Sequence, residues 1–155
     1  MVTSRKLNKR KRIALVAHDH KKAELVEWVK FNKDRLASHE LFATGTTGKL
    51  IEEFFGITVK RLMSGPLGGD QQIGSMIAAA ELDVLIFFWD PMQTQPHDSD
   101  VKALLRLGVA WNIPMACDRA TADFIMTSSY ITDEYEALIP DYTDYLKRSI
   151  TDEQA

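Results

Sequence analysis

The sequence has very little cysteine and no long hydrophobic run. Cys117 is the only cysteine among 155 residues, which excludes an intrachain disulfide and agrees with a reducing compartment. No apolar stretch approaches the ~18 residues that span a bilayer. The apolar run Ile13 to Ala17 is shorter than the ~7 residues of a signal-peptide core. We therefore expect a cytoplasmic protein that makes no membrane contact.

The sequence also lacks a strong charge bias. Its formal net charge is −3, and its apolar and charged fractions of 45% and 26% are typical of soluble globular proteins. The exception is the segment 1–12, which holds six basic side chains and no acidic one. Such a run could contact nucleic acid. Nothing downstream extends the basic patch, so we expect a solvated, flexible leader and no nucleic-acid partner.

No internal repeat and no low-complexity segment interrupts the chain. Its length suits one domain with a single core. We expect a basic leader over 1–12, one α/β domain over 13–150 and a short tail over 151–155.

Short apolar runs alternate with stretches of helical period. The expected strands are 12–19, 40–45, 59–65, 83–90 and 114–118, and the expected helices are 21–31, 46–55, 70–81, 99–111 and 121–128. Strands that are nearly all apolar and that alternate with helices are typical of a parallel sheet whose two faces are both buried. The predicted fold is an open, mainly parallel five-stranded sheet with helices on both faces, a Rossmann or flavodoxin-like three-layer α/β arrangement with right-handed crossovers. A last short helix is expected within 139–150.

Polar and flexible residues follow four of the predicted strands. They are His18 to His20, Thr44 to Gly48, Ser64 to Asp70, and Asp90 followed by His97 to Asp100. Because ligands of open α/β sheets bind at the carboxyl ends of the strands, these residues predict one composite pocket.

The segment "TGTTG" (44–48) opens the second predicted helix. Its glycines, hydroxyls and helix-start amides suit a phosphate group, although hydroxyls at this position are more often simple caps. Lys22 could add positive charge, or it could be an ordinary exposed lysine.

Asp70 precedes a good helix, where its common role is that of an N-cap. The glycines of "SGPLGGD" (64–70) favour another interpretation, because they indicate a backbone that approaches something closely and places Asp70 there.

The histidines leave alternatives open. His97 lies on a predicted loop, where it is either a surface residue or, as a neutral imidazole, a group that polarises a carbonyl oxygen. His18 and His20 also invite a metal site with Asp90 or Asp98, but no further ligand spacing supports one.

The motifs together resemble the methylglyoxal synthase family over nearly the whole chain. They are "IALVAHDH", "LFATGTTG", "SGPLGGDQQIG", "DVLIFFWDP", "PHDSDVKALLRL", "ATADF" and "IPDY", in the family's order and without a departure. The resemblance implies a lyase that converts dihydroxyacetone phosphate to methylglyoxal and inorganic phosphate. It also implies a homohexamer that uses no metal and no organic cofactor. Phosphate, as a product, is an expected inhibitor.

The resemblance also implies roles for individual residues. Asp70 would be the base that removes a proton beside the carbonyl, and His97 would steady the enediolate. His18 would border the ligand, and Asp19 and Asp100 match supporting acidic positions. The phosphate would be held by Lys22, Thr44, Gly45, Thr46, Thr47, Ser64 and Gly65. Whether Arg148 reaches a neighbouring subunit is left open by the sequence.

Two other functions compete with this one. The same fold family includes effector-binding regulatory domains, such as that of carbamoyl phosphate synthetase. Against this reading, the chain stands alone and keeps Asp70 and His97 beside the phosphate motif. A metal-dependent phosphohydrolase built on "HDH" and "HDSD" would need a bound metal.

Overall fold

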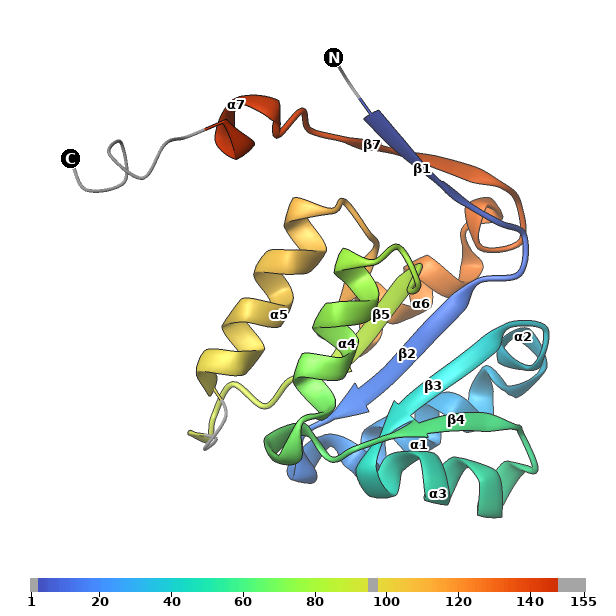
Figure 1. The fold of residues 1–155 in the computed structure, drawn as a ribbon. Helices are drawn as coiled ribbons and strands as arrows, with labels where there is room; N and C mark the ends of the chain where they lie inside the picture. Colours follow the sequence, from blue (N-terminus) through green and yellow to red (C-terminus); the bar gives the residue numbers. More distant parts are fainter. Residues whose placement is uncertain (1–2, 95–97, 148–155) are drawn as a thin grey trace.

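The computed structural model describes residues 3–94 and 98–147 (Figure 1). Its main sheet has five strands in the order β4-β3-β2-β5-β6, and all neighbours run parallel. The strands are β2 (Arg12–Ala17), β3 (Glu40–Thr44), β4 (Val59–Leu62), β5 (Val84–Phe88) and β6 (Met115–Ala116). The predicted parallel α/β sheet is confirmed.

Alternate residues of each strand enter two separate cores, one on each face of the sheet. In β2, Ile13 and Leu15 belong to one core, and Ala14 and Val16 belong to the other. The first face is covered by α1 (Lys22–Phe31), α2 (Lys33–Ala37), α3 (Gly45–Phe55) and α6 (Arg119–Thr127), and the second by α4 (Gly69–Ala78) and α5 (Asp98–Ala110). Burial on both sides explains why the strands read as continuous apolar runs.

Strand β1 (Thr3–Leu7) corrects the prediction of a flexible leader. It pairs antiparallel with β7 (Tyr135–Ile139), from Thr3 opposite Ile139 to Leu7 opposite Tyr135. The two strands form a ribbon apart from the main sheet (Figure 1). Only Leu7 of β1 is buried, so the strand has no apolar pattern of its own and depends on a partner at the other end of the chain. The other domain boundaries stay a prediction.

Arg5 attaches this ribbon to the rest of the molecule. Its guanidinium donates hydrogen bonds to the carbonyl oxygens of Ile77 at 2.6 Å and Ala78 at 2.8 Å, at the end of α4. It also lies 4.1 Å from the ring centre of Trp111. Because the last carbonyls of a helix lack partners within the helix, Arg5 serves as a C-terminal cap for α4.

The short elements were the hardest to predict. The expected last helix is α7 (Thr143–Leu146), whereas α2 and β7 were not expected at all. Three single turns of 3-10 helix, η1 (Asp19–Lys21), η2 (Gly65–Leu67) and η3 (Ser129–Ile131), join the larger elements. Across 3–94 and 98–147, no helix is both long and apolar enough to cross a membrane.

Candidate active site

A cavity of about 160 Å³ lies where the carboxyl ends of β2, β3 and β4 meet. This is the edge at which parallel α/β sheets bind their ligands. Eight residues expected at the site line it: His18, Asp19, Lys22, Thr44, Gly45, Ser64, Gly65 and Asp70. The structure therefore brings together most of the predicted site, from segments that lie far apart in the sequence.

The start of α3 forms one wall of this cavity. Thr44 is the N-cap, with extended backbone, and Gly45 follows at a φ of +50°. A β-carbon on Gly45 would lie 3.2 Å from that of Ser64, so glycine suits both the left-handed backbone and this close approach. The free N–H groups of a helix start attract anions. This wall is therefore suited to a phosphate.

Thr46 and Thr47 lie in the same turn but do not line the cavity. Thr47 is fully buried. Thr46 is exposed, and its hydroxyl accepts a hydrogen bond from Nζ of Lys22 at 3.1 Å. Thr46 is thus linked to the cavity lining through Lys22.

Lys22 supplies the positive charge of the cavity lining. Its Nζ lies 2.8 Å from Oδ1 of Asp19, one turn earlier. The hydrogen bond and charge of Lys22 lower the pKa of the Asp19 carboxyl. The carboxylate of Asp19 in η1 therefore helps to hold the ammonium group of Lys22 beside the start of α3.

Asp70 is the second residue of α4 and is only 2% exposed. The N-cap of α4 is Gly68, whose φ is +118°, so the interpretation of Asp70 as the cap is wrong. Asp70 thus places a carboxylate at the cavity wall, shielded from bulk solvent. Its position fits the predicted base.

Gly69, directly before Asp70, allows the loop to pack closely on its own backbone. A β-carbon on Gly69 would lie 2.1 Å from the carbonyl oxygen of Met63. The backbone does approach something closely, as the sequence indicated. At Gly69, that neighbour is the chain's own backbone.

His18 is held in one tautomer by the end of β5. Its Nδ1 accepts a hydrogen bond from the backbone N–H of Asp90 at 3.0 Å, and its ring packs edge-on against Phe87. The neutral ring therefore carries its proton on Nε2, which makes Nε2 a donor. Asp90, considered in the sequence as a metal ligand, positions His18 through its main chain.

Two described residues that the sequence pointed to, Asp100 and His20, are not part of this cavity lining. Asp100, in the first turn of α5, lines a second cavity of about 200 Å³, and Asp70 lines both cavities. His97 and Arg148 lie outside the described residues. His20 is mostly exposed, 3.8 Å from Asp90. No cluster of three or more metal-binding side chains occurs in the described part of the chain.

Sequence reasoning missed three residues of the lining. Val16 and Ala17 end β2, and Pro66 lies in η2. The first two look like ordinary strand residues, and nothing in their type marks them. Pro66 stands within the glycine-rich loop, which was the available signal.

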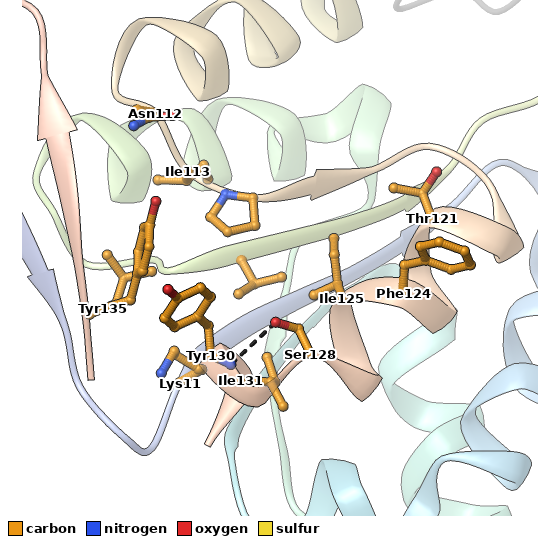
Figure 2. Close-up of a pocket in the computed structure, with 13 residues that line it drawn as sticks. Lys11, Asn112, Ile113, Thr121, Phe124, Ile125, Ser128, Tyr130, Ile131 and Tyr135 are labelled. Atoms are coloured by element: carbon orange, nitrogen blue, oxygen red, sulfur yellow. Dashed lines mark hydrogen bonds between the residues drawn. The ribbon is translucent and has the colours of Figure 1, made fainter. Parts of the chain in front are cut away.

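A larger cavity of about 390 Å³ lies at the opposite end of the sheet, beside the first residue of β5 (Figure 2). Its lining is mostly apolar and includes Phe124, Ile125, Tyr130 and Tyr135. Lys11 is its one cation among the described residues, and the Nζ atom donates to two backbone carbonyls. No carboxylate of residues 3–94 or 98–147 lines this cavity.

Known proteins resemble this chain in both sequence and fold. The model of the MGS-like domain family matches residues 24–117, more than half of the 155 residues. Methylglyoxal synthase from Proteus mirabilis is 56% identical over 146 residues, covering 94% of this chain and 96% of that protein. The protein of the same name from Yersinia enterocolitica is 52% identical over 149 residues, covering 96% and 98%. The chain belongs to the methylglyoxal synthase family.

A solved structure of the methylglyoxal synthase family agrees in fold as well. The crystal structure of methylglyoxal synthase from Elizabethkingia anophelis matches with a TM-score of 0.91 and 66% identity, covering 96% of this chain and 97% of that one. The match over nearly the full length of these family members leaves no room in them for a separate catalytic domain. It therefore favours the enzyme over the regulatory module.

Proposed function

We propose that this protein is a carbon–oxygen lyase that converts dihydroxyacetone phosphate to methylglyoxal and inorganic phosphate. The observation that carries the proposal is the buried Asp70, in one small cavity with Lys22, the start of α3 and Ser64. The carboxylate of Asp70 suits a base, whereas Lys22, the start of α3 and Ser64 suit a phosphate. The high identity to proteins named methylglyoxal synthase supports this reaction.

In this proposal Asp70 removes a proton from the hydroxymethyl carbon beside the carbonyl. Such a step is slow unless donors already stand where negative charge develops on the carbonyl oxygen. His97 is the expected donor to the enediolate, and Nε2 of His18 offers a second N–H at the cavity. A carboxylate base paired with a neutral histidine also serves triosephosphate isomerase, which forms the same kind of intermediate. Asp19 and Asp100 would support these groups.

The phosphate site decides what the enediolate becomes. When the bond from carbon to the bridging oxygen stands perpendicular to the enediolate plane, the π electrons expel phosphate. When that bond lies in the plane, elimination is blocked. We propose that Lys22, Thr44, Gly45, Ser64 and Gly65, which line the cavity, hold the phosphate so that the bond is perpendicular. Thr46 would contribute through its hydrogen bond to Lys22, and Thr47 through its place in the same helix start. A complex with a substrate analogue whose bridging oxygen lies in the plane would contradict this.

The remaining expectations belong to the same proposal. The family resemblance implies that the reaction uses no metal and no organic cofactor, and its two steps are a proton transfer and an elimination. Inorganic phosphate fits the same cavity as the substrate's phosphate, so it should inhibit. A homohexamer is proposed from the family resemblance, and a cytoplasmic location from the short apolar runs and the single cysteine of the sequence.

The deciding experiment is incubation of the protein with dihydroxyacetone phosphate and a chelator, following methylglyoxal and free phosphate together. Equal release of both products would support the lyase and contradict the metal-dependent phosphohydrolase. Release of phosphate with intact dihydroxyacetone would identify a phosphatase. Binding without any reaction, in parallel samples with and without the chelator, would favour the regulatory module.

A further inference from the structure

Two glutamines follow Asp70 in the sequence, and the proposed mechanism uses neither. Gln72 is the fourth residue of α4, with an exposed side chain that lies outside the cavity lining. Its Oε1 nevertheless accepts a hydrogen bond from the backbone N–H of Met63 at 2.8 Å. Holding an exposed glutamine in one rotamer costs conformational entropy. The hydrogen bond must offset this cost, so it indicates a specific arrangement of the side chain.

The hydrogen bond between Met63 and Gln72 joins the start of the loop that carries Ser64 to helix α4. Strand β4 ends at Leu62, so the N–H of Met63 lies just beyond the sheet and needs another partner. Inside the loop, the carbonyl of Ser64 accepts from Leu67 at 3.0 Å and from Gly69 at 2.9 Å. Those two bonds are backbone to backbone. The one from Met63 to Gln72 depends on a side chain.

Helix α4 carries Asp70 and also contacts the loop that carries Ser64. Asp70 and Gln72 lie two residues apart on α4, while Met63 directly precedes Ser64. The carbonyl oxygen of Met63 also lies close to Gly69, so close that a β-carbon on Gly69 would be 2.1 Å from this oxygen. The peptide groups around Met63 are therefore held from both sides by α4. Loss of the Gln72 bond would let Ser64 and Gly65 move relative to Asp70.

We propose that Gln72 is a positioning residue that holds the Ser64 and Gly65 wall of the phosphate site in register with Asp70. The proposal rests on the proposed function of the cavity. Gln72 touches neither the cavity nor the reacting atoms, and it acts through the backbone of Met63. The side-chain oxygen is the group that matters, because it is the acceptor.

The test compares Gln72→Met, which keeps the length of the side chain but removes the acceptor, with Gln72→Glu, which keeps an acceptor oxygen. Gln72→Met should raise the KM for dihydroxyacetone phosphate and the Kd for inorganic phosphate together, by about fivefold, the effect of one net hydrogen bond. The kcat should change by a smaller factor. Gln72→Glu should restore both constants toward the original values, and Gln71→Met serves as the matched neighbour.

Amide exchange at Met63 gives a readout that does not depend on turnover. Exchange of this N–H should be faster in Gln72→Met than in the unchanged protein, and slow again in Gln72→Glu. Unchanged KM, phosphate Kd and Met63 exchange in Gln72→Met would overturn the proposal. So would equal damage in Gln72→Met, Gln72→Glu and Gln71→Met. If the unchanged protein released no methylglyoxal, the proposed function would fail, while phosphate binding and exchange would still test Gln72.

Discussion

The backbone N–H of Asp90 donates a hydrogen bond to Nδ1 of His18 at 3.0 Å, joining the end of β5 to the end of β2. Only an unprotonated Nδ1 can accept such a bond. A main-chain group thereby selects the tautomer of a ring that lines the candidate active site. A side-chain substitution of Asp90 leaves this donor in place, which separates the role of its backbone from that of its carboxylate.

We expect His18 to be neutral at pH 7 with its proton on Nε2. Nitrogen NMR of the ring should show an unprotonated, pyridine-type Nδ1 that is hydrogen-bonded. His39 is an internal reference, because its Nδ1 accepts a bond from the backbone N–H of Lys11 at 2.9 Å. A proton on Nδ1 of His18 would contradict the tautomer and with it the use of Nε2 as a donor.

Asp70→Asn should lower kcat by about 10³-fold or more while phosphate binding persists. The amide fills the same space but cannot take the proton, and general bases contribute on this order. Steady-state kinetics and phosphate titration measure the two effects separately. Asp34→Asn, the same change at an exposed residue of α2, should leave both unchanged. Near-normal turnover of Asp70→Asn would remove Asp70 from the role of base.

Lys22→Met should weaken phosphate binding by about tenfold or more, because a hydrogen bond to a charged group is among the stronger ones. The pKa of Asp19 should rise toward its ordinary value, since Lys22 is the main cause of its lowering. Calorimetry and NMR titration of the carboxyl measure these changes. Lys21→Met is the matched control, because Lys21 faces Glu24 at 3.6 Å instead. Equal effects of the two substitutions would show that general charge, rather than the position of Lys22, governs binding.

The sequence predicted the elements whose burial leaves a local pattern. Strands β2, β3 and β5 are buried on both faces, so their residue types alone identify them. Strand β1 has one buried residue, Leu7, and it exists because β7 lies beside it. No local pattern encodes a partner so distant in the sequence.

The candidate site was predictable for a similar reason. The rule that strand ends meet at one edge, together with the family resemblance, anticipated Lys22, Ser64 and Asp70 at one cavity. The hydrogen bonds from Asp90 to His18 and from Met63 to Gln72 each join a backbone N–H of one segment to a side chain of another. Residue type does not encode such contacts, so only the folded structure shows them.

Arg5→Ala should lower the free energy of unfolding by about 1–2 kcal/mol. The substitution removes two hydrogen bonds from a charged group to the end of α4 and the contact with Trp111. Chemical denaturation measures the change. Lys6→Ala, the adjacent residue of β1, should cost less than about 0.5 kcal/mol, since its pair with Glu134 is exposed. Equal losses would show that Arg5 does not anchor the ribbon specifically.

His39 should make the protein less stable below neutral pH. Burial, aided by the positive charges of Lys11 and Arg10, lowers the pKa of His39 from its ordinary 6.5. The unfolded chain therefore takes up a proton at about pH 6.5 that the folded protein resists. The stability associated with neutral His39 is complete above this value. It is lost as the pH falls from 6.5 toward the lowered folded pKa.

Denaturation curves between about pH 7.5 and about pH 5.5 measure this loss, whose slope for one group is at most about 1.4 kcal/mol per pH unit. His39→Asn is the control, because the asparagine oxygen can still accept from the N–H of Lys11 but does not titrate. The difference in unfolding free energy between the two proteins should therefore depend on pH, with the unchanged protein losing more on acidification. Parallel pH curves would show that His39 is protonated as readily when folded as when unfolded, and would contradict its burial as a neutral ring.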